Sequence, residues 1–162
     1  MNMDAHQFLA VAGDLVESVR SDPAQPNAGA MCRTAVGRAY YALFLLAREF
    51  VSDLDIETRS VPSIHALLEQ ALRNSGVLSL ARIGNALGEL RDQRTDADYE
   101  MRDTTVETVE NAGDVLDDAK AAILQLDLIR AGRLSPPLDR TTVVEAILKW
   151  ASDNSKPLWR KG

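Results

Sequence analysis

The sequence predicts an all-α protein, an up-down bundle of roughly four to five helices followed by a short helical tail. Long segments rich in Ala, Leu, Arg and Glu repeat apolar residues at helical spacing. The sustained alternation that is typical of β-strands is almost absent, and clusters of Pro and Gly separate the segments. A length of 162 residues suits one domain. We expect the bundle over residues 1–132 and the tail over residues 133–162.

The first two helices are separated by a loop that contains two prolines. The first helix is expected over residues 4–19, and the loop covers residues 21–27. Asn27 suits the N-cap of a long second helix that reaches about residue 52. The apolar stripe of the first helix consists of Phe8, Val11, Ala12, Leu15 and Val19. The second helix is apolar on two faces, formed by Ala35, Ala39, Leu43, Leu46 and Phe50 and by Thr34, Tyr41 and Leu45. This pattern is typical of a helix packed on most sides by neighbours or by a second subunit, so we expect a homodimer.

Three further helices and a short amphipathic segment follow. Ser63 is expected to cap the third helix, and Gly76 stops it. The fourth helix is expected over residues 79–94 and the fifth over residues 103–130. The apolar positions of the third helix are Ile64, Leu67, Leu68, Ala71 and Leu72. Those of the fourth helix are Leu80, Ile83, Leu87 and Leu90, and those of the fifth are Val109, Ala112, Leu116, Ala119, Ile123 and Leu126. The steps of three and four residues in the fifth helix indicate a bundle seam. After a break at two prolines, residues 141–150 form the amphipathic segment, and a polar tail with Trp159 ends the chain.

Composition limits the classes of function. The formal net charge of -6 means that any contact with nucleic acid must be local. A single cysteine, Cys32, excludes an internal disulfide, and we expect it to be a small buried hydrophobic residue. No run of about 18 apolar residues suggests a membrane span, and no signal peptide is recognisable, so we expect a cytoplasmic protein. No phosphate loop, metal motif or nucleophile elbow is found, and no cofactor or metal is expected.

Charged residues continue the apolar stripe of the fourth helix. If that helix extends beyond residue 94, Arg91, Arg94 and Asp98 share one face. One interpretation is internal pairing of an arginine with Asp98 or another acid. The other is an arginine cluster that faces a cleft and suits a phosphate or nucleotide.

The second helix places Arg38 and Tyr41 on one side, and the third helix begins near His65. Arg38 has few acidic neighbours in sequence, so its partner must come from elsewhere, and Asp98 is a candidate. The tyrosine suits either core packing or the polar site. His65 suits a partly buried, hydrogen-bonded histidine, or a general acid or base if it approaches the arginines, whereas His6 is expected to be exposed.

Two motifs resemble the HEPN superfamily. They are Arg38-Ala39-Tyr40-Tyr41-Ala42-x-Phe44 and Leu87-x-x-Leu90-Arg91-x-x-Arg94-x-x-Ala97-Asp98-Tyr99, with His65 between them. More narrowly, the chain resembles small bacterial and archaeal members with an Arg-x-x-Ala-Asp-Tyr signature, over roughly residues 4–130. The resemblance implies a helical bundle, commonly homodimeric, with a polar site where the motif helices meet.

The resemblance also implies function. Many relatives are RNA-cleaving toxins or phage-defence effectors, often encoded beside a small nucleotidyltransferase that acts as the antitoxin. In active members four to six residues separate an arginine from a histidine. Here six residues separate Arg91 from Asp98, so Asp98 stands where the longest spacing would place that histidine.

Three hypotheses remain open from the sequence. The first is a non-catalytic, homodimeric module that binds a nucleotide, an RNA or a protein partner through Arg38, Tyr41, Arg91, Arg94, Asp98 and Tyr99. The second is a metal-independent ribonuclease with His65 and Arg94 as candidate catalytic residues, in which Arg91 or Arg94 binds the phosphate and His65 transfers the proton. The third is a structural protein that interacts through its C-terminal tail.

Overall fold

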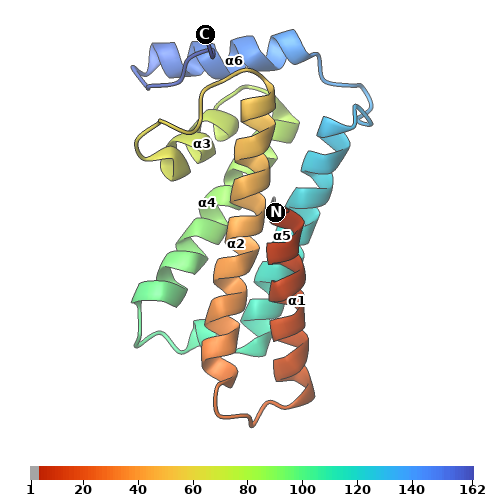
Figure 1. The fold of residues 1–162 in the computed structure, drawn as a ribbon, viewed down its shortest axis with the longest axis vertical. Coiled ribbons are helices and arrows are strands. Elements are labelled where there is room, and N and C mark those ends of the chain that lie inside the picture. Colours follow the sequence, from red (N-terminus) through yellow and green to blue (C-terminus); the bar gives the residue numbers. More distant parts are fainter. Residues whose placement is uncertain (1–3) are drawn as a thin grey trace. The chain divides into compact units, whose positions relative to one another are not determined.

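The structure, a computed structural model, describes residues 4–162, and over these residues it is helical with no β-strand. Figure 1 shows the helices in chain order. They are α1 (Ala5–Ser21), α2 (Ala28–Asp53), α3 (Ile64–Arg73), α4 (Leu78–Tyr99), the 3-10 turn η1 (Thr105–Glu107), α5 (Val109–Arg130) and α6 (Arg140–Asp153). The predicted all-α fold with a C-terminal helix is therefore confirmed. The chain divides into two compact units, Met1–Leu43 with Glu89–Ile123, and Phe44–Gly88 with Leu124–Gly162. The expected domain boundary after residue 132 stays a prediction.

In the first unit, α1 and the beginning of α2 run antiparallel on either side of the loop over residues 22–27 (Figure 1). Asp4 caps α1, because its carboxylate accepts a hydrogen bond from the amide of His6. The buried residues of α1 are Ala12, Val16 and Val19. Val11, which was expected in the stripe, is 44% exposed, because it lies about 100° around the helix from Ala12. Its place in the core is taken by Val16.

The end of α4 and the start of α5 also belong to the first unit. The fourth helix extends to Tyr99, five residues beyond the predicted end, since no Gly or Pro interrupts residues 95–99. The predicted start of the fifth helix is wrong: a 3-10 turn stands there, and α5 begins at Val109. The hydroxyl of Thr108 accepts a hydrogen bond from the amide of Asn111, so Thr108 caps α5.

In the second unit, α3 crosses the beginning of α4 at close range. A Cβ added to Gly84 would lie 2.3 Å from the backbone nitrogen of Arg73, so only glycine permits this approach. Arg73 forms a 2.8 Å ion pair with the buried Glu69. The expected Ser63 cap is wrong, because the backbone of Ser63 is in the left-handed region, with φ of 54°, and its side chain makes no capping hydrogen bond. Gly76, with φ of 75°, follows the end of α3, as expected for a helix stop.

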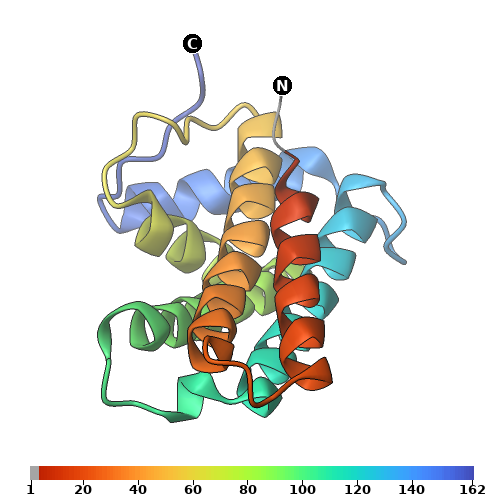
Figure 2. The ribbon, with the colours of Figure 1, turned by 60° about the horizontal axis from the view of Figure 1, so that its bottom comes forward.

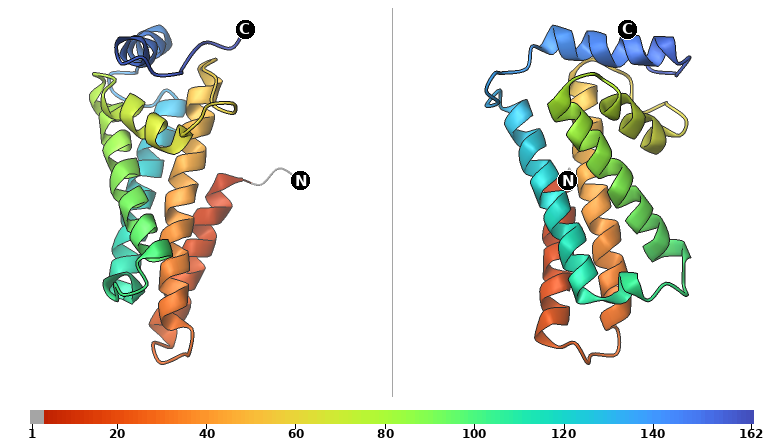
Figure 3. Two further views of the ribbon diagram at one scale, coloured as in Figure 1. Left: turned by 90° about the vertical axis from the view of Figure 1, so that its left-hand side faces the viewer. Right: turned by 180° about the vertical axis from the view of Figure 1, so that it is seen from behind.

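The C-terminal segment closes the second unit. Helix α6 packs against α3 (Figure 3), and the chain then returns to the loop after α2 (Figure 2). The amide of Glu57 donates to the carbonyl of Trp159 at 2.9 Å, and the amide of Lys161 donates to Asp55 at 2.7 Å. Leu158 is buried, whereas Trp159 is 46% exposed. Over residues 4–162, no helix combines the length and apolar character that crossing a membrane requires.

Candidate functional site

Four of the predicted site residues converge in the first unit around the guanidinium of Arg94. Its Nε forms an ion pair with Oδ2 of Asp98 at 2.7 Å, one helical turn further along α4. Its Nη2 donates a hydrogen bond to the hydroxyl of Tyr41 on α2 at 3.3 Å. The guanidinium carbon lies 5.6 Å from the ring centre of Tyr41 and 5.5 Å from that of Tyr99. Arg94 is thus held by two tyrosines and one carboxylate. We call these four residues, Tyr41, Arg94, Asp98 and Tyr99, the Arg94 cluster.

The environment of Arg94 keeps the side chain charged. Burial alone disfavours the cation, but Tyr41, Asp98 and Tyr99 outweigh that effect and raise the pKa of Arg94 above its ordinary value. The Arg94 side chain is 22% exposed and that of Asp98 is 38% exposed. Tyr99 is 65% exposed, so a large part of its ring is open to solvent. The Arg94 cluster therefore combines a fixed cation with an accessible aromatic ring.

Arg33 was not among the predicted site residues, although it fixes the segment that carries the cluster. This residue of α2 is only 8% exposed. Its Nη1 donates to the carbonyl of Ala97 at 2.7 Å and its Nη2 donates to that of Asp103 at 2.8 Å. Further bonds reach the Asp96 and Glu100 carbonyls and the Glu107 carboxylate. Arg33 therefore satisfies terminal carbonyls of α4 and of the following turn, next to Asp98 and Tyr99. Its only sequence signal was a charge in an apolar helix.

Arg38 and Arg91 lie elsewhere around the same helices. The guanidinium of Arg38 is 5.4 Å from the ring centre of Phe8 on α1, an arrangement that permits a cation–π interaction. The expected pairing of Arg38 with Asp98 is wrong, because Asp98 forms its ion pair with Arg94. Arg91 is half-buried on α4, one turn before Thr95. Whether Arg38 and Arg91 contact a ligand stays a prediction.

The two histidines occupy separate settings. His6 is exposed, and its Nδ1 lies 2.9 Å from Oδ1 of Asp4. His65 belongs to the second unit and stacks on Phe44, with ring centres 3.8 Å apart and an angle of 12° between the rings. The guanidinium of Arg48 lies 5.7 Å from the centre of the same Phe44 ring. This packing gives His65 a structural role, and a part in proton transfer stays a prediction.

The described residues offer little for metal or thiol chemistry. Within residues 4–162, no group of three or more His, Cys, Asp or Glu side chains is placed to hold a metal ion. Cys32 is fully buried in α2. Its burial, together with the charges of Glu110 and Glu107, raises the pKa of the thiol and disfavours the reactive thiolate.

Comparison with known proteins agrees with the motif residues. A family model described as the HEPN domain matches residues 29–126, which include both the Tyr41 segment and the Arg94 segment. The chain belongs to the HEPN domain family. The predicted resemblance to HEPN proteins is thus confirmed at the level of the family. No curated protein and no solved structure matches the chain significantly.

Proposed function

We propose that this HEPN domain protein binds single-stranded RNA at the Arg94 cluster and does not cleave it. The observation that carries the proposal is the position of Arg94, which lies near the rings of Tyr41 and Tyr99 while Tyr99 remains 65% exposed. An exposed aromatic ring beside a guanidinium offers a stacking platform for a base next to a donor for a phosphate. Stacking tolerates any base, so the recognition is expected to depend weakly on sequence.

The charges of the chain indicate a small contact. With a net charge of -6, the protein as a whole repels nucleic acid, and the phosphate contacts that we propose are those of Arg94, Arg91 and Arg38. Each phosphate neutralised on a single strand contributes about -0.7 to the slope of log affinity against log salt. One to three contacts therefore predict a slope between about -0.7 and -2, and most of the affinity comes from stacking.

The residue at position 98 argues against the usual cleavage chemistry. Metal-free RNA cleavage at neutral pH requires a group that both accepts and donates a proton, and a histidine meets this need. Asp98 stands at the position of that histidine, and its carboxylate is in an ion pair with Arg94. A carboxylate that is already bonded to an arginine does not replace a histidine that both accepts and donates a proton. We therefore favour binding over the ribonuclease alternative.

Fluorescence anisotropy with a labelled 12-residue oligoribonucleotide, about the length of one single-strand binding site, tests the proposal. Removing the ring with Tyr99→Ala should weaken binding by roughly 5- to 160-fold, the range expected for loss of one stacked base. Arg94→Gln should weaken it by about tenfold and lower the salt slope. Arg82→Gln is the matched control, because Arg82 is an exposed arginine on the same helix, α4. This variant should bind the oligoribonucleotide with the affinity of the wild type.

Two results would overturn this function. Binding that is equal in Tyr99→Ala, Arg94→Gln and wild type would move the contact away from the Arg94 cluster. Cleavage of tRNA or mRNA by the wild type, abolished by both Arg94→Ala and His65→Ala, would establish the metal-independent ribonuclease instead. Incubation without divalent metal ions, followed by gel electrophoresis, separates these readings.

We further propose that the protein is a homodimer. We also propose that its partner is a nucleotidyltransferase-type antitoxin, in a toxin–antitoxin or phage-defence setting. The dimer is supported by a face of α2 on which Thr34 is exposed and Leu45 is half-buried. The antitoxin partner is supported by membership of the family. Light scattering at micromolar concentration should give the mass of two chains, and the mass of one chain would refute the dimer. If a chain truncated before residue 134 remains folded but no longer dimerises, the association depends on the tail rather than on α2.

A further inference from the structure

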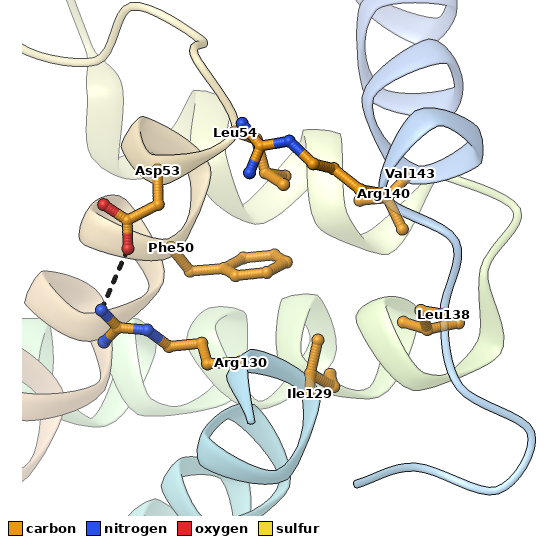
Figure 4. Close-up of a pocket in the computed structure, with 8 residues that line it drawn as sticks. All are labelled: Phe50, Asp53, Leu54, Ile129, Arg130, Leu138, Arg140 and Val143. Atoms are coloured by element: carbon orange, nitrogen blue, oxygen red, sulfur yellow. Dashed lines mark hydrogen bonds and ion pairs between the residues drawn. The ribbon is translucent and has the colours of Figure 1, made fainter. Parts of the chain in front are cut away.

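The second unit contains a cavity that the proposed function does not use. Its volume is about 360 Å³, and it lies between the end of α2, the end of α5 and the beginning of α6. Figure 4 shows the ring of Phe50 crossing the cavity from α2. Phe50, Leu54 and Val143 are buried, so they form an apolar floor. Ile129 and Leu138 are half-buried and complete the apolar lining.

Two arginines stand at the rim of this apolar cavity. Arg130 at the end of α5 donates to Glu49 at 3.2 Å and to Asp53 at 3.0 Å (Figure 4 shows the second bond). Arg140 at the start of α6 donates from one nitrogen, Nη2, to Asp55 at 2.9 Å. A guanidinium carries five N–H donors, so the bonds of Arg140 within residues 4–162 leave most of its donors for a ligand.

The two arginines differ in how readily they accept a new partner. Arg130 is held by two carboxylates, and its side chain is 29% exposed. The pair of Arg140 and Asp55 is open to solvent, with side chains 56% and 73% exposed. Exposed pairs of this kind add little stability, so a ligand carboxylate replaces Asp55 at small cost. The anchor for an anion is therefore Arg140, with the apolar floor beside it.

From this arrangement we infer that the cavity binds a small amphipathic carboxylate, with its apolar body against Phe50 and its carboxylate on Arg140. The volume lies at the lower end of the range for ligand pockets, about 300–1,000 Å³. Liquid water fills about 30 Å³ per molecule, so the cavity corresponds to roughly twelve waters, enough for a short alkyl chain or one aromatic ring. A neutral molecule of the same shape gains the apolar contact and lacks the charge-assisted bond.

Isothermal titration calorimetry on the full chain tests this site, with sodium octanoate as the probe and octan-1-ol as its neutral counterpart. One octanoate should bind per chain, and octan-1-ol should bind about tenfold more weakly. Shortening the probe to hexanoate should weaken binding by about fourfold for each CH₂ removed, since each buried CH₂ is worth roughly 0.8 kcal/mol.

Variants locate the probe. Arg140→Gln should weaken octanoate binding by about tenfold and leave octan-1-ol binding unchanged. Arg133→Gln is the matched control, because Arg133 is an exposed arginine in the same connection and does not line the cavity. Leu138→Trp, at a half-buried position, should fill the cavity and abolish binding of both probes, with unchanged far-ultraviolet circular dichroism showing that the fold persists. No saturable octanoate binding up to about 5 mM, or equal binding by the wild type and both cavity variants, would overturn the inference.

Discussion

Replacing Arg33 by methionine tests how the end of α4 is held in place. Methionine matches the stem of arginine as far as Nε and has no hydrogen-bond donors, so the variant removes the charge and all five hydrogen bonds while it keeps the packing of the stem. Four of these bonds reach main-chain carbonyls of residues 96–103, and the fifth reaches the carboxylate of Glu107. The Asp96 and Glu100 carbonyls also accept main-chain amides, each at 3.0 Å, so the bonds to Ala97 and Asp103 are expected to carry most of the loss.

The cost follows from burial and bond length. The bonds to Ala97 at 2.7 Å and to Asp103 at 2.8 Å are short, and the Arg33 side chain is only 10% exposed. Leaving a buried acceptor without its partner costs about 1–3 kcal/mol, and removing one member of a buried ion pair costs about 3–5 kcal/mol. Glu107 is 37% exposed and regains water, so its share is small. We therefore expect Arg33→Met to lower the free energy of unfolding by about 3–5 kcal/mol, because the individual bonds are not additive.

Urea unfolding followed by far-ultraviolet circular dichroism measures this loss. For a chain of this length the same loss lowers the melting temperature by about 6–20 °C. Arg82→Met is the control, since Arg82 is exposed on α4 and its replacement should change stability by less than about 0.5 kcal/mol. If Arg33→Met unfolds at the urea concentration of the wild type, the bonds around residues 96–103 contribute no stability, and the reasoning is wrong.

Three further predictions concern a glycine, a helix cap and the cysteine. Gly84→Ala should lower the free energy of unfolding in urea by about 1–3 kcal/mol, since the added Cβ would lie 2.3 Å from the backbone nitrogen of Arg73. Gly37→Ala is the control, because its added Cβ meets nothing within 4 Å, and it should be neutral or stabilising. The amide and the hydroxyl of Thr142 donate hydrogen bonds to the Asp139 carboxylate and lower the pKa of that carboxyl. The stability that this cap contributes is therefore present at pH values above the unfolded-state pKa of Asp139. It is lost as the pH falls through the lower folded-state pKa. An NMR titration that finds the pKa of Asp139 at or above its ordinary value would contradict this. Because burial and two nearby glutamates raise the pKa of the Cys32 thiol, a thiol-specific disulfide reagent at pH 8 should label it only after unfolding, and rapid labelling of the native protein would refute its burial.

Most of the buried helix faces were predictable because apolar residues at helical spacing indicate which face meets the core. Leu80, Ile83, Leu87 and Leu90 share one side of α4, and all four are buried as predicted. Helix ends were harder, because they depend on contacts that sequence spacing does not record. Ser63 has the residue type of an N-cap, yet its backbone is left-handed and its side chain makes no capping bond.

The candidate site was only partly predictable for the same reason. The Arg94–Asp98 pair joins residues four positions apart on one helix, so its spacing was visible in the sequence. The bond from Arg94 to Tyr41 joins two helices, and only the fold decides which side chains meet there. The role of Arg33 was hidden more deeply, because its acceptors are mostly main-chain carbonyls and any residue type supplies a carbonyl.

The contrast between Arg33 and Arg94 shows why one is structural and the other suits a ligand. A phosphate that approached Arg33 would have to break bonds to four carbonyls at a site that is 8% exposed. At Arg94 a phosphate replaces mainly Asp98, whose carboxylate is 38% exposed and already competes with water. This exchange substitutes one charge-assisted pair for another and yields little net energy. In the proposed complex, the affinity for RNA must therefore come mainly from the base that stacks on Tyr99, which would let a chain with a net charge of -6 bind a polyanion through so few cations.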